Sequence, residues 1–298
     1  MKKILITGVN GFIGSHCYDY FCKKYDVFGL DYNKSIKNNC IQGAITYETL
    51  NRFNTSFDYI IHLAGSGTVG QVTRNPELEF LKTVDSTKEL LCFISEKSPF
   101  SKIIYSSSAA VYGSNHTVPI SEEAEIKPVS LYGEHKLVVE KLLSEDCKQN
   151  NRKHVIIRFF SIYGEGLKKQ VLWDSCNRIL DNHNKKEIQC FGTGNEKRDF
   201  VHIDDAVRMI ESCIMNVDNH RIFNCGTGIS TSISDIIHQL GSLLDYNGKF
   251  IFENMIQEGN PEYLIANIKE ATKIGFVPRI DIRTGLKRYI EWIKKLKR

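Results

Sequence analysis

Three polar residues have the types and the spacing of a proton-transfer site. Tyr132 and Lys136 lie four positions apart in a stretch expected to be helical, so their side chains share one face. A free phenol titrates near pH ~10, but a neighbouring ammonium favours the phenolate and lowers this value. Ser108 lies 24 residues before Tyr132, at the end of an apolar strand, where its hydroxyl can bond the same substrate oxygen. The set predicts a catalytic Ser/Tyr/Lys site.

The elements that must position these residues begin with a glycine-rich turn. Residues 4–7 are an apolar run typical of a strand, residues 15–25 are helix-like, and between them lie Gly8, Gly11 and Gly14. In a dinucleotide-binding turn one glycine makes the bend, one lets the backbone approach the pyrophosphate, and one lets the helix pack close to the strand. The Gly-x-x-Gly-x-x-Gly spacing is typical of short-chain dehydrogenases. We therefore expect a nicotinamide dinucleotide here, whose positive ring would further favour the phenolate.

An acidic residue follows the next expected strand. Residues 27–30 are apolar, and Asp31 comes about 20 residues after the glycines, where a carboxylate accepts hydrogen bonds from the adenosine ribose. The same carboxylate would repel a 2'-phosphate. The sequence therefore favours NAD over NADP, although Lys34 and Lys37 nearby leave NADP open.

Strand-like and helical stretches alternate over the first half of the chain. The apolar runs lie at residues 4–7, 27–30, 59–63, 103–106 and 155–159. Such alternation predicts an α/β fold, a doubly wound parallel (Rossmann) sheet with both faces covered. We expect residues 1–160 to form the NAD-binding domain. Residues 161–298, which have shorter elements and more polar loops, would form a smaller C-terminal α/β substrate lobe, with some segments returning to the first core.

Composition excludes several other classes of protein. The chain has 298 residues and a formal net charge of +4, with no basic cluster outside its last residues, so we expect no nucleic-acid partner. Its nine cysteines have neither paired spacing nor metal-ligand spacing, and we expect no metal. We see no signal-peptide pattern and no apolar run of transmembrane length, which predicts a cytoplasmic protein without a membrane partner. The last helix should pack through a stripe formed by Leu286, Tyr289, Ile290, Ile293 and Leu296.

Together these motifs resemble the extended short-chain dehydrogenase/reductase family, the NAD-dependent sugar-nucleotide epimerases and dehydratases. The resemblance covers nearly the whole chain and is greatest to the UDP-hexose 4-epimerases. Further stretches match family signatures: residues 61–65, 75–76, 83–87, 157–164, 192–205 and 223–228. The family implies a nucleotide-diphosphate sugar as substrate and NAD as cofactor.

Site residues carry over from the family position by position. The cofactor-binding set is Gly8, Gly11, Phe12, Ile13, Gly14, Asp31, Leu63, Ala64, Gly65, Tyr132, Lys136 and Phe159. The substrate-binding set is Ser108, Ser161 and Arg198, with Arg198 on the diphosphate, for which a planar guanidinium is suited. An ion pair of Arg198 with Asp199 or Asp204 is the structural alternative.

Departures from the family narrow the reaction. Dehydratases carry Asp-Glu after the catalytic serine or threonine and decarboxylases a glutamate, whereas this chain has Ala109 and Ala110. The 3,5-epimerases have a cysteine near this serine, and this chain has none there. Transient oxidation at C4 with epimerisation ranks first, and a 4-ketoreductase or 4-dehydrogenase of surface-polysaccharide synthesis second. A non-catalytic dinucleotide-binding protein is a third alternative. Residues 257–261 lack the second phosphate-binding arginine of relatives, and Ser161 replaces an asparagine, so the base and the sugar stay open.

Relatives commonly dimerise through a four-helix bundle. The corresponding helices here are those around residues 77–95 and 132–150. The resemblance therefore implies a homodimer.

Overall fold

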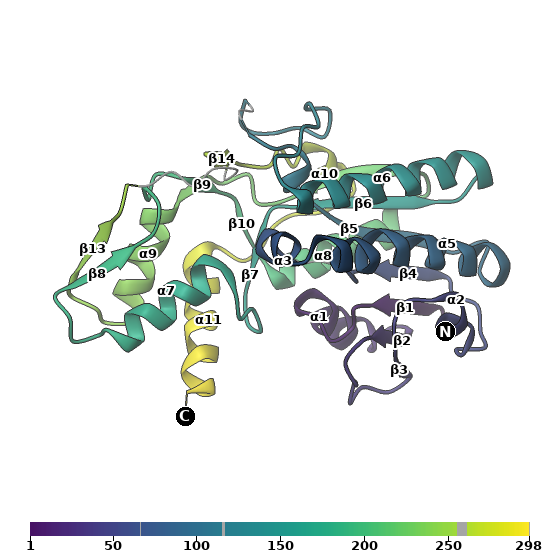
Figure 1. Ribbon diagram of the computed structural model, residues 1–298, viewed down its shortest axis with the longest axis horizontal. Coiled ribbons are helices and arrows are strands. Elements are labelled where there is room, and N and C mark those ends of the chain that lie inside the picture. The colour runs from purple at the N-terminus through teal and green to yellow at the C-terminus, as the bar shows by residue number, and fades with distance from the viewer. Residues whose placement is uncertain (66, 115–116, 255–260, 298) are drawn as a thin grey trace.

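The larger part of the molecule is a seven-stranded parallel sheet. The structure is a computed structural model that describes residues 1–65, 67–114, 117–254 and 261–297 (Figure 1). The strand order is β11-β6-β5-β4-β1-β2-β3, and every neighbouring pair is parallel. The strands are β1 (Lys3–Thr7), β2 (Asp26–Asp31), β3 (Cys40–Gln42), β4 (Tyr59–His62), β5 (Lys102–Ser108), β6 (His154–Phe159) and β11 (Arg221–Cys225). The predicted doubly wound sheet is confirmed, and the five predicted strands match the observed ones to within two residues at each end.

Helices cover both faces of this sheet. One face packs against α1 (Phe12–Phe21) and α8 (Ile203–Asn216), and the other against α2 (Tyr47–Asn51), α5 (Ser86–Lys97) and α6 (Leu131–Asn150). Successive strand residues alternate between the two cores: Ile4 and Ile6 belong to the first and Leu5 to the second. Burial on both faces explains why the strands read as continuous apolar runs.

The segment predicted as one helix around residues 77–95 is divided in the structure. After α3 (Val69–Arg74) it consists of α4 (Pro76–Phe80), a π-helical turn over Leu81–Asp85, and α5. Asn75 begins α4, with its side chain accepting a hydrogen bond from the backbone N–H of Leu78.

The second lobe lies at the carboxyl ends of the central strands and has its own core. Its helices are α7 (Gln170–Asp181), α9 (Ile233–Leu243) and α11 (Ile282–Leu296). Three small sheets join β7 (Ser161–Tyr163) to β10 (Phe200–His202), β9 (Lys197–Arg198) to β12 (Thr231–Ser232) and β14 (Tyr263–Leu264), and β8 (Glu187–Cys190) to β13 (Lys249–Phe252). The short α10 (Lys269–Lys273) packs near β11, back on the main sheet.

The C-terminal helix packs largely as predicted. Leu286, Tyr289, Ile290 and Ile293 are buried, but Leu296 is 47% exposed and does not belong to the buried stripe. Leu296 is the last residue of α11, beyond the reach of the core. All nine cysteines are free. Among the described residues no helix is long and apolar enough to cross a membrane.

Candidate active site

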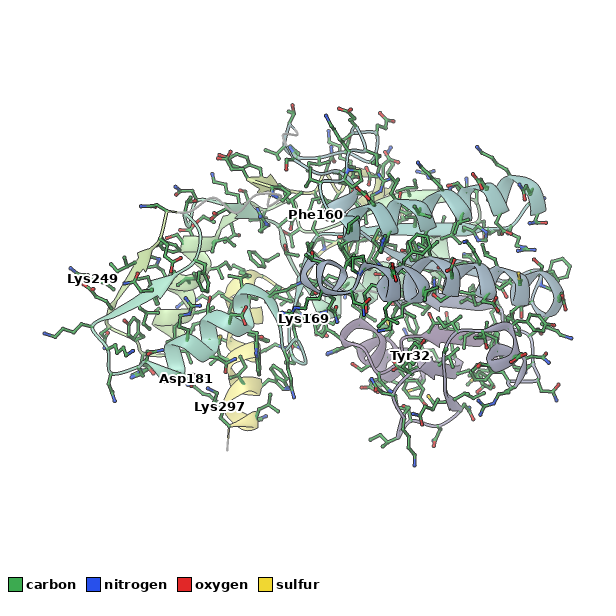
Figure 2. All side chains as sticks on the ribbon, viewed as in Figure 1. Tyr32, Phe160, Lys169, Asp181, Lys249 and Lys297 are labelled. Atoms are coloured by element: carbon green, nitrogen blue, oxygen red, sulfur yellow. The ribbon has the colours of Figure 1, made fainter. Side chains whose placement is uncertain are left out.

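A cavity of about 1160 Å³ separates the main sheet from the second lobe. It opens at the carboxyl ends of β1, β4, β5 and β6, where parallel sheets bind their ligands. Residues of both parts of the chain line it, among them the glycine turn, Ser108, Tyr132 and Arg198. In the full view of the side chains, Lys169 lies at the junction of the two parts (Figure 2).

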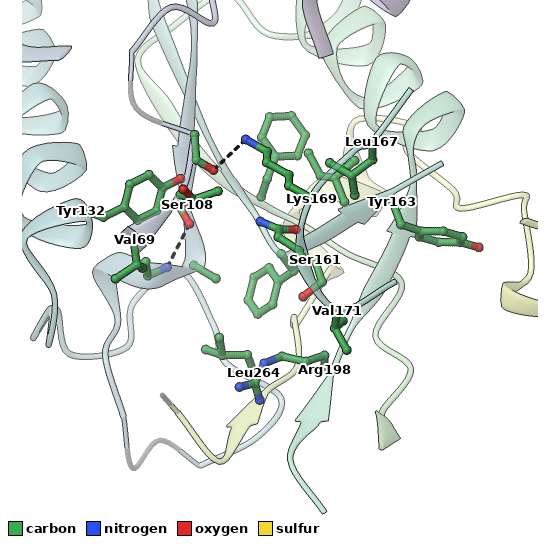
Figure 3. A pocket seen from close by; sticks show the side chains of 18 of the residues that line it. Val69, Ser108, Tyr132, Ser161, Tyr163, Leu167, Lys169, Val171, Arg198 and Leu264 are labelled. Carbon is green, nitrogen blue, oxygen red and sulfur yellow. Dashed lines mark hydrogen bonds between the residues drawn. The ribbon is translucent and has the colours of Figure 1, made fainter. Parts of the chain in front are cut away.

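The structure brings Ser108 and Tyr132 together on one wall of this cavity (Figure 3). Lys136 lies next to Tyr132 in the same lining. Ser108 ends β5, and its Oγ accepts a hydrogen bond from the backbone N–H of Ala110 at 3.2 Å. Ser130 begins α6 by accepting a bond from a backbone N–H in its first turn, and Tyr132 lies in that turn. One turn later, Lys136 is buried with its Nζ 5.8 Å from the centre of the Tyr132 ring.

The electrostatics of this trio suit controlled proton transfer. Burial raises the pKa of Tyr132, and a hydrogen bond with Ser108 opposes the rise. Burial lowers the pKa of Lys136 to about 8, with the charge of Glu140 raising it and the charge of Lys169 lowering it. Lys136 Nζ donates to the backbone oxygen of Ser106 at 2.8 Å. The phenol alone therefore keeps its proton at neutral pH, and a positive charge brought next to it favours the release of that proton.

A buried polar network lies beneath the trio. Glu140, one turn after Lys136 on α6, accepts hydrogen bonds from Ser107 Oγ at 2.5 Å and from Arg158 Nε and Nη2 at 3.0 and 2.7 Å. Arg158 also donates to the Tyr112 hydroxyl at 3.0 Å. Burial opposes the charge of Arg158, but the bonds and charge of Glu140 raise its pKa above the usual value. The network joins α6 to the ends of β5 and β6, through Ser107 and Arg158, which are register partners directly before Ser108 and Phe159.

Sequence reasoning did not find this network. Two signals in the sequence point to it. Arg158 is a charged residue inside an apolar strand and needs a buried partner, and Glu140 lies four positions after Lys136 on the same helix face.

The glycine turn fits a dinucleotide. Gly8 has a φ of +73°, a conformation in which a side chain is strained. A Cβ at Gly14 would lie 2.1 Å from the backbone oxygen of Gly8, so only glycine lets α1 pack this close to β1. These glycines line the cavity together with Gly11, Phe12 and Ile13. The result is a narrow backbone cradle at the start of a helix, the arrangement that binds a pyrophosphate.

We predict that Gly14→Ala weakens NADH binding by at least about tenfold, because the added methyl pushes α1 away from Gly8 and displaces the cradle. A fluorescence titration with NADH measures the loss. Gly70→Ala is the matched control, since a Cβ at Gly70 meets nothing within 4 Å. Equal NADH affinity in the two variants would contradict the assignment of this turn to the cofactor.

The other predicted cofactor residues divide into two groups. Leu63, Gly65 and Phe159 line the cavity. Asp31 and Ala64 are not among the described residues that line the cavity. The Asp31 carboxylate, at the end of β2, accepts hydrogen bonds from the backbone N–H groups of Asn10 and Asn33 at 3.0 and 2.9 Å. This holds Asp31 beside the turn at the edge expected to receive the adenosine ribose.

Both substrate residues predicted in the second lobe line the cavity. Ser161 begins β7, and Arg198 lies on β9, where its Nη1 donates to the backbone oxygens of Lys197 and Glu262 at 2.8 and 3.3 Å. Asp199 accepts bonds from the backbone N–H groups of Thr227, Gly228 and Ala266, and Asp204 pairs with Arg288. Asp199 and Asp204, the two candidate ion-pair partners of Arg198, therefore hold other segments in place. Residues 257–260, where the sequence lacks a second arginine, lie outside the described part of the chain.

Comparison with known proteins identifies the family. A family model described as the NAD dependent epimerase/dehydratase family matches residues 4–226. The chain belongs to this family. The resemblance inferred from the motifs is confirmed, and the protein is an enzyme of a family whose cofactor is NAD.

Individual members of the family share both sequence and fold with the chain. A putative UDP-glucose 4-epimerase of Methanocaldococcus jannaschii is 29% identical over 303 residues, covering 98% of each chain. The UDP-glucose 4-epimerase of Thermotoga maritima, solved with UDP-glucose, is 26% identical with a TM-score of 0.89, covering 99% of this chain and 100% of its own. The UDP-glucuronic acid 4-epimerase of Bacillus cereus, solved with UDP-glucuronic acid and NAD, is 26% identical with a TM-score of 0.88, covering 99% of each chain.

Proposed function

We propose that the protein is an NAD-dependent nucleotide-sugar 4-epimerase. The observation that carries the proposal is the surroundings of the catalytic serine. Ala109 and Ala110 follow Ser108, and Ala110 lines the cavity. In the described part of the lining the acids are Glu196 and Glu253, both from the second lobe. Elimination of water needs an acid–base pair beside the reacting carbon, whereas 4-epimerisation needs only the transfer of one hydride and one proton.

The trio performs the proton transfer of this reaction. Tyr132 Oη takes the proton of the sugar C4 hydroxyl as the C4–H bond breaks, and Ser108 hydrogen-bonds the same oxygen. The Lys136 ammonium favours the phenolate form of Tyr132 and is held in place by its bond to Ser106. The glycine turn would hold NAD, which when bound would supply the acceptor and donor of the C4 hydride. Return of the hydride to the opposite face of C4 in the 4-keto sugar, and of the proton to the C4 oxygen, gives the epimer without net oxidation.

The second lobe would hold the nucleotide sugar. Arg198 is buried at the cavity wall, and its guanidinium suits a diphosphate because its planar fork pairs with two phosphate oxygens. Ser161 lies between Lys169 and Arg198, on the side of the cavity across from Ser108 and Tyr132, where a hydroxyl can bond the sugar (Figure 3). We propose UDP-sugars, hexose or hexuronate, as the substrates to test first, since the relatives named above act on both.

The experiment is an NMR assay for the C4 epimer. Purified protein is incubated with UDP-glucose, UDP-glucuronic acid and other nucleotide sugars, without added cofactor. Conversion without net oxidation supports the epimerase. Conversion only with a stoichiometric supply of NAD or reduced cofactor would identify a 4-dehydrogenase or a 4-ketoreductase instead. No conversion, together with nucleotide-sugar binding, would favour a non-catalytic role.

We also propose that the enzyme is a homodimer. The support is the implied pairing of α5 and α6, together with the exposure of Leu78, Leu81 and Leu131 in α4, the π-helical turn and α6. The expected mass by light scattering is about twice 34.1 kDa. A mass of one chain across the working concentration range would contradict this.

The same substrate class supports a cellular role. Nucleotide sugars are activated donors for glycosyl transfer. We propose that the enzyme works in the cytoplasm and supplies such a donor to polysaccharide biosynthesis.

A further inference from the structure

Lys169 lines the cavity and reaches from the second lobe to the first. It lies directly before α7, is half-buried and lines the cavity. Its Nζ donates to the backbone oxygen of Gly67, in the loop after β4, at 3.4 Å (Figure 3). The view of all side chains shows the same bridging position between the lobes (Figure 2).

The Lys169 ammonium approaches the loop after β4 at a glycine, which has no side chain in the way. A Cβ at Gly67 would come within 2.5 Å of Lys169 Nζ. The loop that carries Lys169 also rests on the first part of α1: a Cβ at Gly166 would lie 3.5 Å from the Phe12 ring, and the His16 ring hydrogen-bonds the backbone oxygen of Glu165 at 2.7 Å. The loop that leads to Lys169 therefore lies against the helix that begins at the glycine turn.

Among the described residues, no carboxylate balances the charge of Lys169. No ion pair recorded within 4.0 Å among the described residues involves Lys169, and the nearby Glu165 pairs instead with His202 and Arg288. Burial lowers the pKa of Lys169, and the charge of Lys169 in turn helps to lower the pKa of Lys136. Two ammonium groups thus face one cavity, an arrangement that an anionic ligand would stabilise.

We propose that Lys169 binds the pyrophosphate of the NAD cofactor. In the described lining the cations are Lys136, Lys169 and Arg198. Lys136 serves Tyr132, and Arg198 lies at the far end of the cavity with Ser161 between it and Lys169 (Figure 3). The glycine turn offers the pyrophosphate backbone N–H groups only, so Lys169 is the cation available to its two negative charges.

This assignment has a consequence for the catalytic cycle. A cofactor held by α1 on one side and by Lys169 on the other ties the two lobes together and resists release between turnovers. The inference rests on NAD as the family's cofactor and not on the sugar reaction, so it can fail or hold independently of the proposed function.

The test compares Lys169→Met with Lys168→Met, a substitution of the neighbouring exposed lysine. Cofactor is stripped from the full-length variants, and NADH affinity is measured by fluorescence titration without sugar nucleotide. We expect Lys169→Met to weaken binding by about tenfold or more, as for loss of one charged hydrogen bond, and Lys168→Met to bind as the wild type. Lys169→Arg should retain most of the affinity.

A second readout identifies the ligand, and a third checks folding. The ³¹P resonances of the bound pyrophosphate should shift in Lys169→Met and stay in place in Lys168→Met, and thermal unfolding checks that both variants fold. NADH affinity and ³¹P resonances unchanged in Lys169→Met would overturn the proposal. A variant that binds NADH normally but has lost affinity for UDP-glucuronic acid, and not for UDP-glucose, would also overturn it and assign Lys169 to the sugar carboxylate.

Discussion

The Tyr132→Phe variant should lose about a hundredfold to ten-thousandfold in kcat and still bind NADH. The substitution removes only the Tyr132 hydroxyl, the group proposed to take the proton of the sugar C4 hydroxyl, while the ring keeps its place in the first turn of α6. A loss of this size corresponds to about 3 to 5.5 kcal/mol in the activation barrier. The rate of C4 epimer formation by NMR, measured beside NADH affinity by fluorescence, separates the loss of chemistry from a loss of binding.

Tyr105→Phe is the matched control for this prediction. Tyr105 is buried in β5, and in the described part of the chain its hydroxyl has no hydrogen-bond partner. Its ring, 5.0 Å from Lys136 Nζ, is kept in the variant. We expect activity close to that of the wild type. If Tyr132→Phe retained the activity of Tyr105→Phe, another group would have to carry the proton.

The features that follow from local sequence were predictable. The central strands are short apolar runs because both faces of the sheet are covered, and the glycine turn has a spacing that its close packing requires. Tyr132 and Lys136 share a helix face by their spacing alone, and their meeting with Ser108 follows from the position of Ser108 at a strand end.

Features that depend on packing between distant segments were not predictable. Glu140 and Arg158 meet because α6 lies across β6, which no local pattern specifies. Lys169 reaches Gly67 from a residue separation of 102, through the arrangement of two lobes. The π-helical turn at Leu81–Asp85 interrupts a pattern that reads as one helix. In each case contacts between distant segments decide the structure. The sequence alone shows only a charged residue without an evident partner, or an ordinary helical periodicity.

The Glu140→Gln variant should unfold with about 3 to 5 kcal/mol less free energy than the wild type. The side chains of Glu140 and Arg158 are each 4% exposed, so the neutral amide leaves a buried guanidinium without its counter-charge. Chemical denaturation measures the loss. Glu145→Gln, on the exposed side of the same helix, is the matched control and should change the free energy of unfolding by less than about 0.5 kcal/mol.

The same variant should shift the pH dependence of catalysis. The pKa of Lys136 is about 8, and the charge of Glu140 raises it. Removing that charge in Glu140→Gln therefore lowers the pKa of Lys136 below about 8. The ammonium is then lost at a lower pH as the pH rises, and the alkaline limb of the kcat/KM profile moves to lower pH. An unchanged profile in a folded Glu140→Gln enzyme would limit Glu140 to a structural role.

A double substitution separates the energy of the ion pair itself from the cost of leaving one buried charge without its partner. Glu140→Met combined with Arg158→Met removes both buried charges, so its free energy of unfolding should lie closer to the wild type than that of either single variant. Strictly additive losses would show that the two side chains act independently despite the 2.7 Å between Glu140 Oε2 and Arg158 Nη2. If stability recovers in the double variant but turnover does not, the ion pair, through Ser107, positions Ser108 as well as stabilising the fold.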